Sequence, residues 1–378
     1  MKHIYSYAQS IERKLSILFD AAAEGVVSKG DLVAIKMHFG EPGNNRLILP
    51  EHVRVIVQKV KEAGGEAFVT DSTGIGLASA RGTAHSLLKA AVMHGYTPDV
   101  IGAPLVVADG LKGFSGVKVK VNGLRLKEVD VAQAIAEADS LVSLAHVKGH
   151  PRTGLAGALK NIGVGGLTKC GRAPLHLANK PQVNLEKCSA CEECVSFCPT
   201  GAITISDSKP TINHEKCIWG CGCWDTCPEN AISGWFEMHH DTNTELCIRV
   251  ADAAAAIINH LGRDKVVFFN LAYNITPHCD CLPYGDMPIV PDIGILASRD
   301  PVAIDKASID MINNSPEMPG SASSNLNAMD PHEDKLSRTV LNYPPFKSVR
   351  PRGPDWRSMI EAAFKLGLGN IEYELIPF

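Results

Sequence analysis

The sequence predicts an α/β fold with a mostly parallel sheet and helices on both faces. Short apolar runs alternate with helix-length amphipathic segments from Asp31 to His150, the order typical of βαβ units. The same alternation returns after residue 237, and the cysteine-rich stretch 183–236 interrupts it. We therefore expect residues 1–182 and 237–378 to form one α/β domain, in one body or two lobes. Residues 183–236 would be a small inserted α+β module.

The first half of the chain supplies the clearest elements. Residues 31–40 (D-L-V-A-I-K-M-H-F-G) are an apolar run ending in glycine, which indicates a buried strand followed by a loop. Residues 50–63 carry apolar side chains at helical spacing between Pro50 and the pair Gly64-Gly65. The pattern continues with strands at 66–73, 99–109 and 140–150 and with helices at 82–95 and 131–138. A hairpin around Asn122-Gly123 is expected at 118–126.

The second half repeats the pattern with longer gaps. We expect a helix at 248–261, strands at 265–272 and 289–298, and helices at 301–311 and 355–366. Asp300 precedes the first of the last two helices, and Gly367 ends the second. Residues 313–353 are rich in Pro, Ser and Asn, which favours a long ordered loop or covering segment.

Composition narrows the class of protein. The chain has 378 residues, of which 45% are apolar and 21% charged, with a net charge of −4. This balance is that of a globular protein and gives no reason to expect nucleic acid or an anionic membrane as a partner. No apolar stretch is long enough to span a bilayer, and the first residues lack a signal-peptide pattern. Oxygen-sensitive clusters and free thiols would place the protein in the cytoplasm, and we take an anaerobe as its source.

Two cysteine blocks carry the strongest motif. Residues 188–199 read C-S-A-C-E-E-C-V-S-F-C-P, the bacterial ferredoxin spacing, and residues 217–228 read C-I-W-G-C-G-C-W-D-T-C-P. In such pairs, three cysteines of one block bind one [4Fe–4S] cluster and the fourth binds the other. We therefore predict a ferredoxin-like module with two [4Fe–4S] clusters, held by Cys188, Cys191, Cys194 and Cys227, and by Cys217, Cys221, Cys223 and Cys198.

The second block departs from the ferredoxin spacing. Cys221 comes one place late, with Gly220 where a cysteine is expected, although the span from Cys217 to Cys223 is unchanged. Glycines on both sides of Cys221 would let the loop bring its sulfur to the cluster. Structural zinc is the alternative, because it also uses paired cysteines. Two runs that each close with Cys-Pro favour iron–sulfur clusters over zinc.

Polar side chains follow several of the predicted strands, where ligands of α/β sheets usually bind. They are Lys36, His38, Asp71, Ser72, Thr73, His146, Lys148 and His150, followed by Arg152, Lys160 and Asn161. We expect Lys36, Lys148 and Lys160 to orient an anionic small-molecule substrate. The alternative is that these lysines are solvated surface residues. The G-V-G-G turn is too short to be a nucleotide-binding fingerprint.

A run of His278, Cys279, Asp280 and Cys281 follows the predicted strand at 265–272. Cys279 and Cys281 are candidate ligands of an additional metal ion, but C-x-C alone is a poor chelate and needs partners from elsewhere. The candidates are His146, His150, His176 and Cys170. Alternatively, the two cysteines are thiols beside a substrate pocket, or redox-active thiols. His146, His150 and His278 would be ligands or proton donors.

Several motifs together resemble one family. They are A-I-K-M-H-F-G, T-D-S-T, H-V-K-G-H-x3-G-x5-K-N-I-G, P-H-C-D-C, P-D-I-G-I-L-A-S-R-D-P-V-A-I-D and the C-terminal G-L-G-N-I-E-Y-E-L-I. The chain resembles the domain-of-unknown-function 362 family, often described as iron–sulfur centre proteins, over nearly its whole length. The resemblance implies an α/β domain with an inserted two-cluster ferredoxin module and no well-established substrate. The offset of Cys221 departs from the ordinary ferredoxin pattern and bears on the geometry of the second cluster.

Two functions follow from these expectations. In the first, the protein is an oxidoreductase whose clusters pass electrons to a small-molecule or metal site in the α/β domain. A large domain around the module favours this reading, because a two-cluster ferredoxin needs only about sixty residues. In the second, it is a non-catalytic electron-transfer subunit that docks to a redox partner protein. A metal-sensing or structural role is a weaker third.

Overall fold

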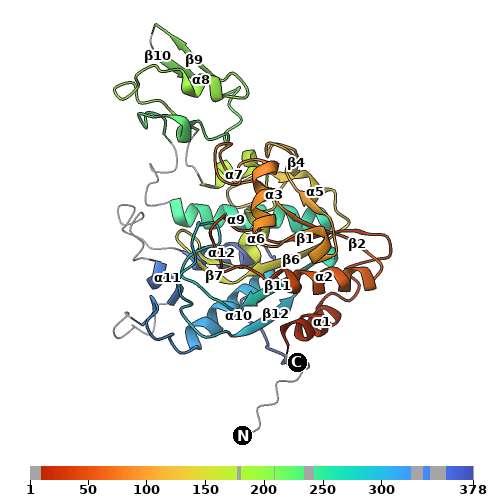
Figure 1. The fold of residues 1–378 in the computed structure, drawn as a ribbon. Coiled ribbons are helices and arrows are strands. Elements are labelled where there is room, and N and C mark those ends of the chain that lie inside the picture. The colour runs from red at the N-terminus through yellow and green to blue at the C-terminus, as the bar shows by residue number, and fades with distance from the viewer. Residues whose placement is uncertain are drawn as a thin grey trace.

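The computed structural model describes residues 10–176, 180–207, 209–233, 242–324, 335–340 and 355–377. Within them the main sheet has six strands (Figure 1), in the order β12 (Gly294–Ser298), β11 (Val266–Ala272), β6 (Ser140–His146), β1 (Leu32–Lys36), β2 (Glu66–Asp71) and β3 (Leu105–Val107). All neighbouring pairs are parallel except β11 with β12. The predicted α/β fold with a mainly parallel sheet is confirmed.

Side chains of the central strands alternate between two hydrophobic cores. Val33 and Ile35 of β1 face one core, whereas Ala34 between them faces the other. Val267 and Phe269 of β11 repeat this alternation. Successive side chains of a strand point to opposite faces, so strands buried on both sides are apolar throughout. This explains why the strand segments are continuous apolar runs in the sequence.

Helices cover both faces of the sheet. One core contains residues from α1 (Ile11–Ala22), α2 (Pro50–Glu62) and α3 (Ala84–Met93). The other contains residues from α6 (Ala158–Gly163), α9 (Thr242–Leu261), α10 (Pro301–Asn314) and α12 (Trp356–Lys365). The shorter helices are α4 (Pro98–Ile101), α5 (Gln133–Ala136), α7 (Lys169–His176), α8 (Glu193–Phe197) and α11 (Lys335–Val340), with 3-10 turns at Cys223–Thr226 and Arg263–Lys265.

The predicted start of the helix after Asp300 is confirmed. The Asp300 carboxylate accepts hydrogen bonds from the N–H groups of Val302 (2.9 Å) and Ala303 (2.8 Å), which satisfies two donors that an α-helix leaves open at its start. It also accepts the N–H of Asn370 (2.7 Å). One aspartate therefore caps α10 and fastens the C-terminal segment to it.

Two predicted elements in the first half have the predicted type over only part of their length. Residues 99–109 were expected to be one strand, but α4 occupies their start and only β3 is extended. Pro98 at the first helical position and Gly102 at φ 80° provide a start and a stop for this helical turn. Residues 131–138 were expected to be helical. The helix is present but shorter, as α5 (Gln133–Ala136), because the two residues before it belong to β5 (Glu128–Ala132), which pairs antiparallel with β4 (Gly116–Lys120). The hairpin around Asn122-Gly123 is therefore present, with a longer connection than predicted.

Three further predicted segments differ from the structure in their extent or content. The strand at 140–150 stops at His146, and residues Lys148–His150 form β7, which pairs antiparallel with β8 (Gly154–Ala156). The strand at 289–298 is limited to β12. Within 313–353, α11 is a helix, whereas 325–334 and 341–353 lie outside the described residues.

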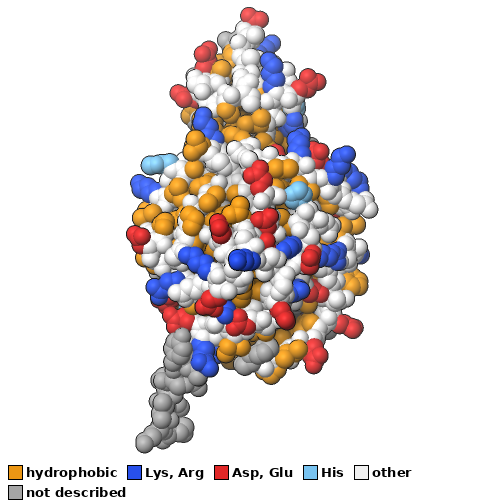
Figure 2. Space-filling model, turned by 90° about the vertical axis from the view of Figure 1, so that its right-hand side faces the viewer, with side chains coloured by type: hydrophobic (Ala, Val, Ile, Leu, Met, Phe, Trp, Pro, Cys, Tyr) orange, Lys and Arg blue, Asp and Glu red, His pale blue; other side chains and the backbone are white. Residues whose placement is uncertain are grey.

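The cysteine-rich unit projects from the end of the α/β body near α7 (Figure 1). It contains α8 and an antiparallel pair, β9 (Ile203–Ser206) with β10 (Lys209–Ile212). It also has its own small hydrophobic cluster, which includes Cys194, Ile203 and Trp224. Figure 2 shows charged side chains of both signs toward its tip and hydrophobic side chains at its base. Its boundaries stay a prediction, because residues 177–179 and 234–241 lie outside the described part of the chain.

None of the helices that the structure describes is long and apolar enough to cross a membrane.

Candidate functional site

The carboxyl ends of β1, β2 and β6 border a cavity of about 640 Å³. Lys36, Asp71 and His146 are the last residues of these strands and all line it. Because the three strands are parallel neighbours, their ends meet at one edge of the sheet, where α/β proteins usually bind ligands. The cavity volume falls in the range of small-molecule sites.

Asp71 organises one wall of the cavity. Its carboxylate lies 3.1 Å from Lys36 Nζ and 2.9 Å from His38 Nδ1, and it accepts the N–H groups of Phe39 and Ser72. Burial alone raises the pKa of Asp71, but the neighbouring Lys36 and His38 lower it well below its usual range. Lys36 also donates to Asn161 Oδ1 (3.0 Å). Lys36 is therefore a buried, fully partnered cation.

His38 is the last member of this network, and one of its ring nitrogens has no hydrogen-bond partner among the described residues. Because Asp71 accepts the proton on Nδ1, the other ring nitrogen of neutral His38 carries a lone pair. That Nε2 atom is buried and has no hydrogen-bond partner among the described residues, and His38 lines the cavity. Burial and the charge of Arg81 lower the pKa of His38, which favours this neutral form.

Asp280 organises the facing wall. Its carboxylate contacts His146 Nδ1 at 3.1 Å through both oxygens and accepts from Lys148 Nζ at 2.7 Å. Burial raises the pKa of Asp280, but Lys148 and His146 lower it well below its usual range. His146 Nε2 contacts the carbonyl oxygen of Tyr273 at 2.9 Å, so both ring nitrogens are engaged. His146 therefore positions Asp280. It is not one of the three residues whose ligand atoms lie close enough together for a metal ion, which are His150, Cys279 and Cys281.

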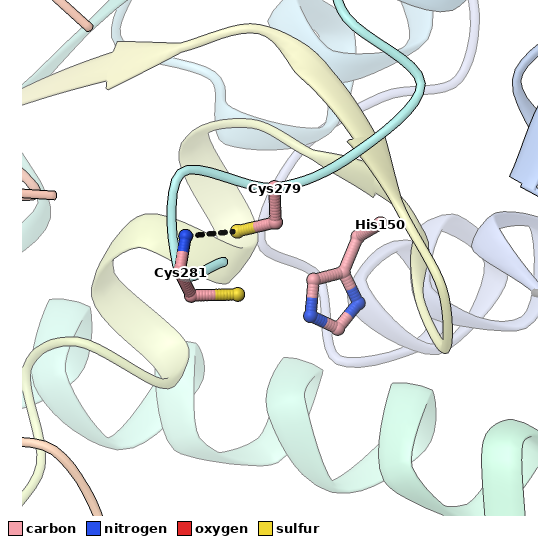
Figure 3. A group of neighbouring side chains, drawn as sticks. All are labelled: His150, Cys279 and Cys281. Atoms are coloured by element: carbon pink, nitrogen blue, oxygen red, sulfur yellow. Dashed lines mark hydrogen bonds between the residues drawn. The ribbon is translucent and has the colours of Figure 1, made fainter. Parts of the chain in front are cut away.

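His150, Cys279 and Cys281 come together beside the cavity (Figure 3). Their ligand atoms all lie within 4.8 Å of one another, a separation that suits one metal ion. His150 ends β7, whereas the cysteines lie in the loop after β11. Gly149 lets these segments meet, because a Cβ there would lie 2.2 Å from the carbonyl oxygen of Pro277. The sequence alone did not indicate which histidine would join the two cysteines.

The hydrogen bonds of His150 define its tautomer. Its Nδ1 accepts the backbone N–H groups of Arg152 (3.2 Å) and Thr153 (3.1 Å). Burial first, and then the charge of Lys160, holds the pKa of His150 well below its usual range, so the ring is neutral and its proton is on Nε2. Figure 3 shows the ring nitrogen farther from Cβ facing the two sulfurs. Without a metal, a proton of His150 therefore points at the thiols.

Cys279 is surrounded by hydrogen-bond donors. The Nζ of Lys160 lies 3.8 Å from its sulfur, and the N–H of Cys281 lies 3.4 Å from it. Hydrogen bonding from the Cys281 thiol, which outweighs burial, together with the charge of Lys160 holds the pKa of Cys279 well below its usual range. The same hydrogen bond, with burial, raises the pKa of Cys281. The lowered pKa favours the thiolate at Cys279, and the raised pKa favours the thiol at Cys281.

Two other predicted candidates lie elsewhere. His278 packs edge-on against Tyr284, with ring centroids 5.9 Å apart, and is outside the cavity lining formed by the described residues. Cys170 lies near the second cysteine block, since Cys221 and Cys217 affect its pKa, which burial raises to about 11. His176 does line the cavity. Arg81 and Arg172 also line it, although no sequence motif indicated them.

The last cysteine of each block lies near the cysteines of the other block. Cys188, Cys191, Cys194 and Cys227 line one small cavity, although Cys227 belongs to the second block. Burial and then Cys221 raise the pKa of Cys217, and Cys198 of the first block contributes to the same shift. Gly220 and Gly222 have φ angles of 145° and 87°, so both glycines beside Cys221 adopt backbone conformations that other residues rarely take.

The cysteine-rich unit contacts the loop after β2. The N–H of Gly76 donates to the carbonyl of Gly220 (3.1 Å), and that of Leu77 donates to the carbonyl of Cys221 (2.7 Å). A Cβ on Gly222 would lie 2.5 Å from Gly76 Cα, so glycine is needed for this approach. Asp225, between Cys223 and Cys227, lines the 640 Å³ cavity. The cavity therefore touches both parts of the molecule.

The chain has distant similarity to several known proteins. The chain is 27% identical over 139 residues to the thylakoid-associated protein sll1697 of Synechocystis sp., a match over 36% of this chain and 39% of that protein. Lactate racemase apoprotein from Thermoanaerobacterium thermosaccharolyticum aligns over 81% of this chain and 56% of its own, at 14% identity and a TM-score of 0.40. A Thermotoga maritima protein aligns over 69% of this chain and 49% of its own, at 11% identity and a TM-score of 0.35.

The chain spans well under two thirds of the length of each of these relatives. One family model covers most of it. Residues 33–310 match the family described as Domain of unknown function (DUF362), which includes every strand of the main sheet but the first residue of β1, and the whole cysteine-rich unit. The resemblance to this family is thereby confirmed over residues 33–310, and the chain belongs to the DUF362 family.

Proposed function

We propose that this protein is an iron–sulfur oxidoreductase, in which two [4Fe–4S] clusters serve a small-molecule or metal site in the cavity. The observation that carries the proposal is the position of Asp225. It lies between two cysteines of the second block and lines the same cavity as Cys279 and Cys281. A group in the cavity would therefore lie directly against the cysteine-rich unit. Bound clusters would supply one-electron transfer there.

The surroundings of the cysteines suit iron–sulfur clusters. Backbone N–H groups donate to the sulfurs of Cys188 (3.4 Å), Cys198 (3.3 Å) and Cys227 (3.2 Å). Hydrogen bonds of this kind stabilise thiolates and tune the potential of a cluster. The cavity shared by Cys188, Cys191, Cys194 and Cys227 supports the predicted ligand exchange. The second cluster would be held by Cys217, Cys221, Cys223 and Cys198.

The charges of the cavity support an anionic substrate. Six cations line it (Lys36, Arg81, Lys148, Arg152, Lys160 and Arg172) against four carboxylates (Glu41, Asp71, Asp225 and Asp280). Lys36 and Lys148 are paired with Asp71 and Asp280, so they mainly fix the walls. Lys160 Nζ instead lies 3.8 Å from the sulfur of Cys279, and no carboxylate of the described residues forms an ion pair with it. Lys160 is therefore the lysine best suited to receive an anion.

A non-catalytic electron-transfer subunit is the second candidate. The exposure of Cys191 favours it, because a cluster bound there would lie close to solvent and to a redox partner protein. In the oxidoreductase, the same exposed edge would be where electrons enter. The two functions differ in what happens in the cavity.

Iron and sulfide analysis of anaerobically purified protein tests the cluster assignment. Two clusters require about eight irons per chain. Zinc in place of iron, or iron near zero, would contradict the proposal. To separate enzyme from carrier, reoxidation of the dithionite-reduced protein by small anionic oxidants would be followed in wild type and Lys160→Met. A slower rate in the variant, with unchanged iron, supports the oxidoreductase, whereas equal rates favour the carrier.

A further inference from the structure

We propose that Cys279 and Cys281 are a redox-active dithiol, and that the cavity takes a small anionic disulfide, which this pair reduces. The inference rests on the proposed function, because the iron–sulfur clusters are the reductant that regenerates the dithiol. The proposal makes the two cysteines the reducing group and makes small anionic disulfides the substrates of the cavity.

The first support is the arrangement of donors around Cys279. Cys279 is 1% exposed and yet lines the cavity, so a bound molecule can reach a sulfur that bulk water does not surround. Lys160 Nζ and the N–H of Cys281 both approach this sulfur. Such a set of donors stabilises a thiolate, which is the nucleophilic form in thiol–disulfide exchange.

The second support is the tautomer of His150. A metal-binding histidine normally donates its second ring N–H to a carboxylate, a carbonyl or water. In His150 that second nitrogen, Nδ1, instead accepts two backbone N–H groups. The Nε2 atom therefore carries a proton toward the sulfurs, where a metal would need a lone pair. This geometry suits a hydrogen bond to a thiolate better than coordination of a metal.

The third support is the spacing of the cysteines. Their sulfurs are in one group with all ligand atoms within 4.8 Å, so a small local movement would join them. A disulfide between residues two apart closes a small, strained ring, and strained disulfides are easier to reduce. Such a bond is suited to a catalytic cycle, in which it must be broken after every turnover.

The exchange balances without any further reactant. The Cys279 thiolate attacks the bound disulfide RS–SR, so that a Cys279–SR bond forms, the original S–S bond breaks and RS⁻ leaves. The sulfur of Cys281 then displaces the second RS group, and its proton passes to a departing thiolate. The products are RS⁻, RSH and the Cys279–Cys281 disulfide. Two electrons and one proton convert this disulfide back to one thiolate and one thiol.

The charge of the cavity selects among disulfides. Lys160 lies beside the attacking sulfur, that of Cys279, and would stabilise both the Cys279 thiolate and the departing RS⁻. With six lining cations against four carboxylates, the cavity favours a disulfide that carries carboxylates over one that carries ammonium groups.

The test is a single turnover with two disulfide probes. Protein with its iron content measured would be mixed anaerobically with DTNB, which carries carboxylates, or with cystamine, which carries ammonium groups. We expect wild type to release two thionitrobenzoates at this site and to form a Cys279–Cys281 disulfide, identified by peptide mass. Cys281→Ser should release one and retain a mixed disulfide on Cys279. Cys279→Ser should form neither adduct.

Matched lysine variants test the specificity. Lys160→Met should lower the DTNB rate roughly tenfold, because the variant loses the cation that attracts the carboxylates of DTNB and stabilises the departing thiolate, and it should remove most of the preference over cystamine. Lys112→Met changes an exposed lysine outside the cavity lining and should alter neither. A mixed disulfide that persists in wild type would overturn the proposal. So would thiols that react only after a chelator removes a metal, since Cys279 and Cys281 would then be ligands.

Iron content separates this inference from the proposed function. Full iron without exchange at Cys279 overturns the dithiol and leaves the iron–sulfur assignment standing. Normal exchange in protein that never binds about eight irons overturns the iron–sulfur assignment and leaves the thiol chemistry without its reductant.

Discussion

The backbone N–H of Leu77 donates a 2.7 Å hydrogen bond to the carbonyl oxygen of Cys221. The loop after β2 is thereby joined to the second cysteine block. Gly74 and Ile75, a few residues earlier in this loop, line the cavity. One short segment therefore contacts both the cysteine-rich unit and the proposed substrate site, so changes in this loop should affect the coupling between them.

Gly76→Ala should loosen this contact. Gly76 has φ 83°, and a Cβ there would lie 2.7 Å from a carboxylate oxygen of Asp225. Gly25→Ala is the matched control, because Gly25 has φ 72° but no atom within 4 Å of a Cβ. Both variants should lose about 1 kcal/mol of unfolding free energy through backbone strain. Only Gly76→Ala should accelerate amide hydrogen exchange at Leu77. Equal exchange in the two variants would contradict the importance of this contact.

Replacing Cys227 should remove the cluster of the first block. Cys227 shares a cavity with Cys188, Cys191 and Cys194. We expect Cys227→Ser and Cys188→Ser to lose the same electron paramagnetic resonance signal, and iron to fall from about eight to about four per chain. Cys198→Ser should instead match Cys217→Ser. If Cys227→Ser loses the signal that Cys217→Ser loses, the ligands are not exchanged.

Asp280→Asn should destabilise the fold strongly. The substitution leaves the buried ammonium of Lys148 without the carboxylate now 2.7 Å away. Breaking a buried ion pair in this way costs about 3–5 kcal/mol. The surface pair of Lys118 and Glu128 is the control, and Glu128→Gln should cost at most about 1 kcal/mol. Denaturant unfolding measures both, and similar losses would mean that Asp280 is not an important structural anion.

Alkylation of Cys279 should proceed at lower pH than that of Cys170. Only thiolates react, so each rate rises with pH until the pH exceeds the pKa of that thiol. Hydrogen bonding from Cys281 lowers the pKa of Cys279, whereas burial raises that of Cys170 to about 11. As the pH rises, the rate of modification by iodoacetamide should therefore level off at a lower pH for Cys279 than for Cys170, whose rate should still be rising at about pH 9. Timed peptide mapping measures both, and parallel profiles would refute the assigned thiolate.

Much of the fold could be predicted because local patterns agree with it. Apolar runs such as residues 32–36 read as strands because both faces of the sheet are covered. Asp300 and Pro301 marked a helix start because capping depends on neighbouring residues alone. The errors arose where local patterns are ambiguous. The elements at 98–101 and 128–132 have only four and five residues, and an apolar segment of that length fits a strand or a helical turn equally well.

The residues of the candidate site also fall into two groups, those that the sequence indicates and those that only the structure identifies. The sequence by itself determined the two cysteine blocks and the C-x-C pair, because ligand spacing and loop chemistry are local properties. Only the tertiary structure decided that His150 joins Cys279 and Cys281, that His146 supports Asp280, and that Asp225 reaches the cavity. These residues are far apart in the sequence. His146 and His150 meet the loop after β11 because β6 and β11 are parallel neighbours that bring their carboxyl ends to one edge, whereas Asp225 reaches the cavity because the second cysteine block contacts the loop after β2.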